Sequence, residues 1–301
     1  MLWLGQTDVE RCGPSPAECI DLCAAALRDR AAGDAELPPK LGISPRPESV
    51  LHAMPARVRD AVGMKWISVY PGRRPAISGL IVLNDPDTGQ PQAVLDAAWI
   101  TAARTAACAA LAARQLARTD AEVLGIVGPG VQSRAAVAAL RIALPKLRLI
   151  QAYAPRRESA ERFAADTGGT AVGTAEDALR GADVAITAAP WPSRAPPPIL
   201  PEWVAAGAFV CALDYDASLS PACAASFDRR FADDRAQMRL ARANGSFAAW
   251  PDDFSDLHGA ARSRPEEKLL CANLGLAILD VALGQTVLDR ARSSRVGQEL
   301  R

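Results

Sequence analysis

Residues 125–140 read GIVGPGVQSRAAVAAL, a short apolar run joined to an alanine-rich helix by a glycine turn. Residues 128–133 have the form G-x-G-x-x-S, after a predicted strand and at the start of a predicted helix. Glycine suits a tight turn that must approach a pyrophosphate, and N–H groups at the helix start attract its charge. A plain tight turn is the alternative, but the strand–turn–helix context favours a dinucleotide. The predicted cofactor-binding residues here are Gly128, Gly130, Val131, Gln132 and Ser133.

The segments that follow alternate short apolar runs with helical patterns, which predicts a doubly wound, parallel Rossmann sheet. The predicted strands are 122–128, 147–153, 170–173, 183–189 and 208–214, and the helices between them are 133–144, 159–168 and 175–182. The proline-rich segment 189–201 is expected to be a loop beyond a strand end, where ligands bind in this architecture. Trp191 in this loop is a candidate wall of a nicotinamide pocket, with packing on the surface as the alternative.

The end of the second strand bears on which dinucleotide binds. In QAYAPRRES (151–159) no acid stands at the strand tip, whereas NAD-binding proteins usually place one there for the ribose hydroxyls. Arg156 and Arg157 instead stand where a 2′-phosphate would lie, although two solvated surface arginines are the alternative. The pattern favours NADP(H), with NAD(H) as the other candidate. Thr187, at the end of the strand 183–189, completes the predicted cofactor-binding set.

The remainder of the chain predicts a second domain of mixed α/β structure. A helix is expected over 15–32, antiparallel strands over 64–96, and a helix over 97–118 with Asp96 as its N-cap. Residues 266–291 are expected to form one long amphipathic helix. The predicted domains are therefore residues 1–115 with 270–301, and residues 116–269.

Two cationic residues stand in apolar surroundings. Arg104 lies in AAWITAARTAACAALAA, where a buried guanidinium would need a carboxylate, from a substrate or from an internal salt bridge. Lys65 in MKWISVY shares one strand face with Ile67 and Val69. Its ammonium either guards a sheet edge or points into a site, and spacing alone does not separate these alternatives.

Two carboxylates follow the strand predicted at 208–214. Asp214 and Asp216 stand two residues apart, so the strand period predicts that they project the same way, towards the cofactor cleft. An aspartate that closes a turn or caps a helix is the alternative for either.

Composition excludes several classes of protein. The 34 Lys and Arg residues balance the 34 Asp and Glu residues, so no basic excess points to nucleic acid. No apolar run approaches the ~20 residues of a membrane span, and the N-terminus turns acidic too soon for a signal peptide. Seven cysteines without metal-type spacing and two histidines, His52 and His258, argue against a metal site and against Ser-His-Asp hydrolysis. We expect a cytoplasmic chain with reduced thiols and no bound metal.

Several short motifs have a recognisable spacing. They are MPA (54–56), GMKW (63–66), DPDTGQPQAVLD (85–96), ITAARTAA (100–107), GPGVQS (128–133), ADD (232–234) and NLGLAILDVA (273–282). The order T-G-x-P, R-T-A-A, G-x-G-x-Q is specific. On these motifs the chain resembles the ornithine cyclodeaminase/mu-crystallin family over most of its length.

The resemblance implies a homodimer of two-domain subunits. The N-terminal α/β domain, joined by the C-terminal helix, would provide the substrate site and the dimer contacts, and the Rossmann domain would bind the cofactor. By position Lys65 and Arg104 would hold the substrate carboxylate and polarise its carbon–nitrogen group, with Lys40 as a further carboxylate ligand. Asp216 would be the catalytic acid at the reacting nitrogen. The implied activity is NAD(P)-dependent hydride transfer at the C–N bond of an α-imino or α-amino acid.

Departures from the family pattern keep two other activities open. Ser220 stands where the family often has a lysine, Asp214 replaces a usual small residue, and NLGLA replaces a serine-containing segment. These changes make an ornithine cyclodeaminase-type lyase the less favoured member of the set. An NADPH-binding accessory protein of mu-crystallin type, with little catalysis, is the second alternative. The side chain of the substrate and the direction of the reaction cannot be predicted.

Overall fold

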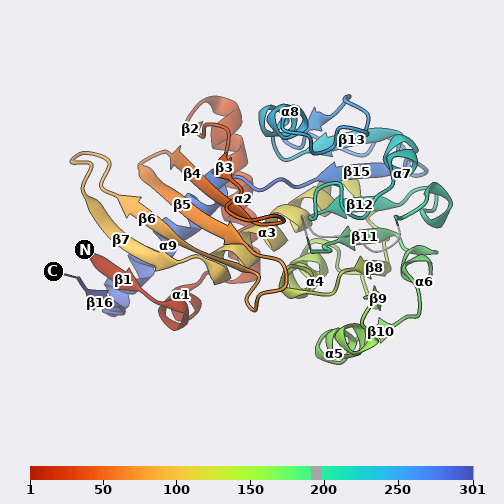
Figure 1. Cartoon of the computed structure of the whole chain (residues 1–301), viewed down its shortest axis with the longest axis horizontal. Helices are drawn as coiled ribbons and strands as arrows, with labels where there is room; N and C mark the ends of the chain where they lie inside the picture. Colours follow the sequence, from red (N-terminus) through yellow and green to blue (C-terminus); the bar gives the residue numbers. More distant parts are fainter. Residues whose placement is uncertain (191–197, 301) are drawn as a thin grey trace. The chain divides into compact units, whose positions relative to one another are not determined.

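The computed structural model describes residues 1–190 and 198–300, so the expectation for Trp191 lies outside the described residues. The chain divides into two units (Figure 1). Unit 1 comprises Met1–Ala107 and Gly275–Arg301, and unit 2 comprises Cys108–Leu274. The first division falls inside helix α3 (Ala98–Leu116) and the second just before helix α9 (Ala277–Ser294).

Unit 2 is built on a sheet whose strand pairs are all parallel, which confirms the doubly wound Rossmann prediction. Its order is β10-β9-β8-β11-β12-β15-β13-β14. The strands are β8 (Val123–Val127), β9 (Leu149–Tyr153), β10 (Thr170–Ala171), β11 (Val184–Thr187), β12 (Phe209–Ala212), β13 (Arg229–Ala232), β14 (Ser255–Asp256) and β15 (Leu269–Ala272). Since the chain runs outward from β8 in both directions, the strand order reverses between β8 and β11. Ligands bind at such a point in open α/β sheets.

Helices cover this sheet on both faces. Those of unit 2 are α4 (Val131–Ala143), α5 (Arg157–Thr167), α6 (Ala175–Leu179), α7 (Pro221–Ala225) and α8 (Arg235–Ala243), with a 3-10 turn η1 (Pro201–Trp203). One face packs with α6, α7 and α8 in a single apolar core. The other face carries Cys211 and Cys271, which lie close to Cys108 of α3. Burial raises the pKa of both strand thiols well above the usual value, as expected for core cysteines rather than nucleophiles.

The predicted continuous helix over 266–291 is wrong. Leu269–Ala272 is strand β15, inserted between β12 and β13, and α9 begins only at Ala277. All four residues of β15 are fully buried, because both faces of the sheet are covered. A central parallel strand therefore has the continuous apolar sequence that a buried helix also has. Gly275, with φ +86°, lies in the link between the two elements.

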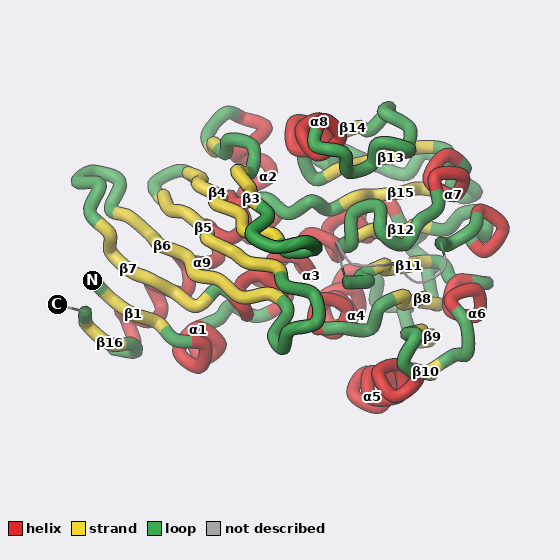
Figure 2. Tube along the Cα trace, viewed as in Figure 1, coloured by secondary structure: helices red, strands yellow, loops and turns green. Residues whose placement is uncertain are grey.

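Unit 1 contains a second sheet, in the order β16-β1-β7-β6-β5-β4-β2, with β3 paired to β4. The strands are β1 (Leu2–Leu4), β2 (Ala35–Glu36), β3 (Leu41–Ile43), β4 (Val50–Val58), β5 (Ala61–Val69), β6 (Ile77–Asn84), β7 (Pro91–Asp96) and β16 (Gln298–Glu299). The predicted antiparallel strands over 64–96 correspond to β5, β6 and β7 (Figure 2). The predicted helix over 15–32 is α2 (Pro16–Ala32), which the Ser15 side chain caps, and α1 (Gln6–Cys12) precedes it.

The two faces of this sheet differ. Helix α9 contacts β4, β5 and β6, and Figure 1 shows it behind these strands. Alternation along β5 turns Lys65 and Ile67 inward, where they are buried, and leaves Trp66 exposed on the opposite face. One face of this sheet therefore packs against α9. The opposite face, which carries Trp66, is apolar and turns away from α9.

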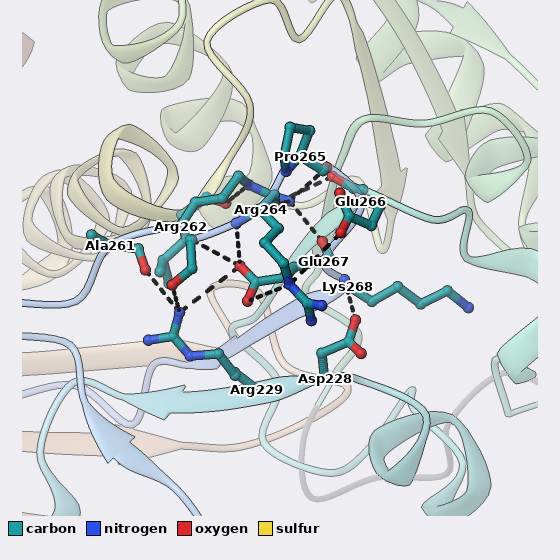
Figure 3. A network of polar contacts seen from close by, with 12 residues as sticks. Asp228, Arg229, Ala261, Arg262, Arg264, Pro265, Glu266, Glu267 and Lys268 are labelled. Atoms are coloured by element: carbon teal, nitrogen blue, oxygen red, sulfur yellow. Dashed lines mark hydrogen bonds and ion pairs between the residues drawn. The ribbon is translucent and has the colours of Figure 1, made fainter.

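A network of polar contacts fixes the amino ends of the unit 2 strands (Figure 3). The Arg262 guanidinium donates to the backbone carbonyls of Leu116, Gly207 and Glu267, at 2.8, 3.0 and 2.7 Å. The buried Glu267 carboxylate accepts from two backbone N–H groups, of residues 263 and 264. These contacts provide hydrogen-bond partners for backbone carbonyl and N–H groups of the loops before the strands. This edge of the sheet is therefore stabilised by internal polar contacts. None of the helices in the described part of the chain has the length and hydropathy needed to cross a bilayer.

Candidate functional site

The glycine turn after β8 lies where the strand order of unit 2 reverses. Gly128 has φ +89°, and a Cβ there would lie 2.5 Å from the backbone carbonyl carbon and oxygen of Ala188. Gly130 is the N-cap of α4, and a Cβ at Gly130 would meet nothing within 4 Å. The buried Ser133 donates its hydroxyl to the Gly128 carbonyl at 2.7 Å. Gly128 therefore allows the tight turn, and Gly130 leaves open space for a ligand. The Ser133 hydrogen bond ties the first turn of α4 to the glycine turn.

The start of α4 fits a phosphate group. No side chain caps the helix, and its first turn contains no acid. Val131 is 70% exposed. The Gln132 Oε1 atom is buried and has no hydrogen-bond partner among the described residues. The uncapped helix start leaves backbone N–H groups that can bind the pyrophosphate of a dinucleotide.

The two arginines at the tip of β9 have different surroundings. Arg157 donates from Nε to Glu161 at 2.7 Å, four residues on, and its side chain is 79% exposed. Arg157 is therefore a surface residue, in line with the alternative of two solvated surface arginines, and it also forms an ion pair. Arg156 is the exposed N-cap residue of α5, without such a pair in the described residues. Of the two, Arg156 is the better placed to meet an anion at this strand end.

Asp214 ties the carboxyl ends of β11 and β12 together. Its carboxylate accepts from the Thr187 hydroxyl at 2.6 Å, the Ser218 hydroxyl at 2.6 Å and the Ala189 N–H at 2.8 Å. Burial raises the pKa of Asp214, and the three donors oppose that rise. The Thr187 hydroxyl proton is therefore committed to Asp214, and the Thr187 side chain is fully buried. Asp214 has the structural role that the turn alternative describes.

The prediction that Asp214 and Asp216 project the same way is wrong. Strand β12 ends at Ala212, and Tyr215 has φ +60°, so the period of two does not extend across this turn. Asp216 is half-buried, and its Oδ2 accepts from the N–H of Phe247 at 2.6 Å. Its other oxygen has no hydrogen bond within the described part of the chain.

Lys65 and Arg104 meet at one carboxylate inside unit 1. The Lys65 Nζ lies 2.6 Å from Oδ1 of Asp280, and the Arg104 Nε donates to the same oxygen at 3.1 Å. Lys65 and Asp280 are fully buried, and Arg104 is 9% exposed. Strand β5 is central in its sheet, so an edge guard is excluded for Lys65. The internal ion pair that was one alternative for Arg104 is present.

This cluster carries more positive than negative charge. Lys40, half-buried between β2 and β3, acts electrostatically on both Lys65 and His52. Burial, and then Arg104, lower the pKa of Lys65 to about 7, while Asp280 opposes them. Burial and the two lysines lower the pKa of His52 to about 4, so this ring is neutral at physiological pH. Two cationic side chains thus oppose the Lys65 ammonium and one carboxylate supports it, so a bound carboxylate would stabilise the charged form of Lys65.

Neither Asp280 nor Gly275 is identified as a site residue from the sequence. Both lie in the segment 266–291, which was predicted as one helix although α9 begins only at Ala277. Asp280 is an acid within LAILDVA, the same signal that selected Arg104. Gly275 lies against Arg104, because a Cβ at this glycine would stand 2.6 Å from the guanidinium Nη1. Ser220, where the family often has a lysine, caps α7 by accepting from the Cys223 N–H at 3.0 Å.

Comparison with known proteins gives concordant matches. The sequence profile of the ornithine cyclodeaminase/mu-crystallin family matches residues 4–220. Alanine dehydrogenase of Archaeoglobus fulgidus is 32% identical, over 94% of this chain and 93% of that protein. Ketimine reductase mu-crystallin of Mus musculus is 30% identical, over 81% of this chain and 82% of that protein. The structure of an archaeal alanine dehydrogenase dimer with bound NAD has a TM-score of 0.88 at 30% identity, covering 100% of this chain and 99% of that chain.

The two glycines of the turn give a matched pair of variants. We expect G130A to keep the free energy of unfolding within about 1 kcal/mol of wild type, because its Cβ enters open space. The same methyl group would narrow the approach to the helix start and weaken dinucleotide binding at least about tenfold. G128A should lose about 2–4 kcal/mol of stability from backbone strain and the clash with Ala188. Urea unfolding and cofactor titration measure both effects, and unchanged affinity in G130A would exclude this turn as the phosphate site.

Proposed function

The chain belongs to the ornithine cyclodeaminase/mu-crystallin family, and from this premise we propose that it interconverts an α-imino acid and an α-amino acid with a nicotinamide dinucleotide. The observation that carries the proposal is the cationic cluster of unit 1. Lys65 is fully buried, and Asp280 is its ion-pair partner. Arg104 and Lys40 both act on Lys65 as like charges, so a carboxylate ligand would be attracted to this cluster. An α-carboxylate is the group that every imino and amino acid of this class carries.

Each residue has a task that its surroundings support. Arg104 and Lys65 would bind the substrate carboxylate by charge-assisted hydrogen bonds, with Lys40 adding to the field. When bound, the dinucleotide supplies or accepts the hydride at the carbon of the C–N bond. Asp216 would hold or move the proton at the substrate nitrogen. The Phe247 N–H orients its carboxylate through one oxygen, and the second oxygen has no hydrogen bond in the described residues.

Turnover of a substrate panel tests the proposal. Purified protein is mixed with NADPH or NADH and with α-keto acids plus ammonia or methylamine, cyclic ketimines, or L-ornithine, and cofactor oxidation is followed. We expect reduction of imines and no release of ammonia from L-ornithine, because Ser220, which caps α7, stands where the family pattern often has a lysine. Arg104→Ala should lower kcat/KM on the best substrate by about a hundredfold or more. Tight cofactor binding without turnover would favour an accessory binding protein, and ammonia release from ornithine would favour a lyase.

We also propose that the cofactor is NADP(H) in preference to NAD(H). The support is the absence of an acid from QAYAPRRES (151–159) and the position of Arg156 at the N-cap of α5, beyond β9. A guanidinium at this place would pair with a 2′-phosphate, which NAD lacks.

Arg156 and Arg157 give a matched test of cofactor choice. We expect Arg156→Ala to raise the Kd for NADPH about tenfold, worth about 1.4 kcal/mol, and to leave the Kd for NADH within about twofold. Arg157→Ala serves as the control, since that side chain is exposed and paired with Glu161. Equal losses for both dinucleotides in R156A would show that this residue does not read the 2′-phosphate. Fluorescence titration of the reduced cofactors measures all four constants for each variant.

A homodimer is the assembly that we propose, formed through the sheet face of unit 1 that turns away from α9. Trp66 pairs across the strands with Leu80 on one side and Ala53 on the other, and Ala53 pairs with Leu41. This row is apolar and open, with Leu41 70%, Trp66 42% and Leu80 37% exposed. Rows of this kind on a sheet are typical of an interface between subunits.

Charge placed on this face should dissociate the dimer. We expect wild-type protein to sediment at about twice the 31.7 kDa chain mass and Trp66→Glu to sediment as a monomer, because a carboxylate would be buried without a partner. Leu149→Glu is the control, an exposed apolar residue (48%) at the start of β9 in unit 2. A dimeric W66E, or a monomeric wild type, would contradict the proposed interface. Analytical ultracentrifugation at several concentrations distinguishes these results.

A further inference from the structure

One carboxylate oxygen organises the two cations of unit 1. Asp280 lies in the first turn of α9, and its Oδ1 is 2.6 Å from Lys65 Nζ on β5 and 3.1 Å from Arg104 Nε on α3. The Asp280 side chain is fully buried. Its other oxygen, Oδ2, has no hydrogen-bond partner among the described residues. Within the described residues, the polar contacts of the Asp280 carboxylate are therefore with Lys65 and Arg104.

Building on the proposed function, we propose that Asp280 is a positioning residue, which keeps Lys65 charged and holds it beside Arg104 so that both can receive the substrate carboxylate. The residue does not itself touch the substrate. It sets the ionisation of one ligand group and the orientation of the other.

The ionisation argument follows from the charges that face Lys65. Arg104 from α3 and Lys40 from the segment before β3 both oppose its ammonium, and Asp280 from α9 supports it. His52 on β4, whose pKa is held near 4, is neutral and gives no support. With Asp280 present the pKa of Lys65 is about 7, and burial is the main cause of its depression. Without the carboxylate that pKa would fall further, and Lys65 would be a neutral amine at neutral pH.

The orientation argument follows from the approach of α9. Gly275, at the entry to this helix, has φ +86°, and a Cβ there would lie 2.6 Å from Nη1 and 3.1 Å from Cζ of Arg104. The guanidinium is thus placed against backbone at Gly275 while Asp280 accepts from its Nε. Two residues of one segment fix the plane of the guanidinium, which matters because bidentate binding of a carboxylate depends on that plane.

Asp280→Asn is the decisive variant. The change is isosteric, and it removes the negative charge while an amide oxygen can still accept from Arg104. We expect the alkaline limb of the kcat/KM profile for carboxylate substrates, where activity falls as Lys65 loses its proton, to shift down by about one pH unit. At about pH 7.5 kcat/KM should be about tenfold lower than in wild type. Asp289→Asn is the matched control on the same helix, since Asp289 is exposed and its carboxylate accepts only from Gln285 among the described residues. An alkaline limb and a KM in D280N equal to those of wild type would overturn the proposal.

Two further measurements keep the test independent of folding and of activity. Arg104→Gln removes a like charge from Lys65, so the alkaline limb should move to higher pH, opposite to D280N; an unmoved limb would exclude Lys65 as the titrating group. NMR spectra of the Lys65 ammonium nitrogen, assigned by loss of its signal in Lys65→Met, follow the titration without any substrate. We expect the Lys65 midpoint to fall in D280N even if no substrate on the panel turns over, and an unchanged midpoint would overturn the inference while leaving the proposed function standing.

Discussion

The contact on which unit 1 depends is the carboxylate of Asp280 between Lys65 and Arg104. Removing charges from water costs several kcal/mol for each ion, and mutual attraction offsets that cost only where partners lie close. Here one acid serves two cations, so the cluster joins the sheet through β5, the helix α3 and the helix α9 at a single point. A core held only by apolar packing would be cheaper to build. A buried ammonium with two like charges near it is consistent with the carboxylate-binding role proposed for this cluster.

Unit 2 separates stability from function at opposite edges of its sheet. At the amino ends of the strands, Arg262 and Glu267 satisfy the backbone groups of the loop 261–268. At the carboxyl ends, the turn after β8 leaves open space at Gly130 and an uncapped start to α4. The reversal of strand order between β8 and β11 accounts for this division, because the loops on either side diverge there and leave room for a ligand. Asp214, just after β12, then holds the end of β11 in place through Thr187 and Ala189.

The sequence predicts those features that depend on local signals. The Rossmann strands and the glycine turn can be predicted because their periods and turn residues are contained in short segments, and Lys65 and Arg104 because charge in an apolar run is conspicuous. Strand β15 escapes prediction because a strand buried on both faces has no period, so 269–272 looks like part of the following helix. The partner of the two cations, Asp280, lies 176 residues from Arg104. Only the tertiary fold brings it there, and no local pattern states which acid neutralises which base.

The polar side chains of the loop after β12 are used largely for contacts inside unit 2. Asp214 is occupied by three donors, one oxygen of Asp216 by the Phe247 N–H, and Ser220 by the start of α7. Asp214, Ser220 and one oxygen of Asp216 are therefore already engaged in hydrogen bonds within unit 2. The cations of unit 1, in contrast, suit the carboxylate that all α-amino acids share. The proposed recognition therefore depends on the carboxylate that α-imino and α-amino acids share, and not on the side chain of the substrate.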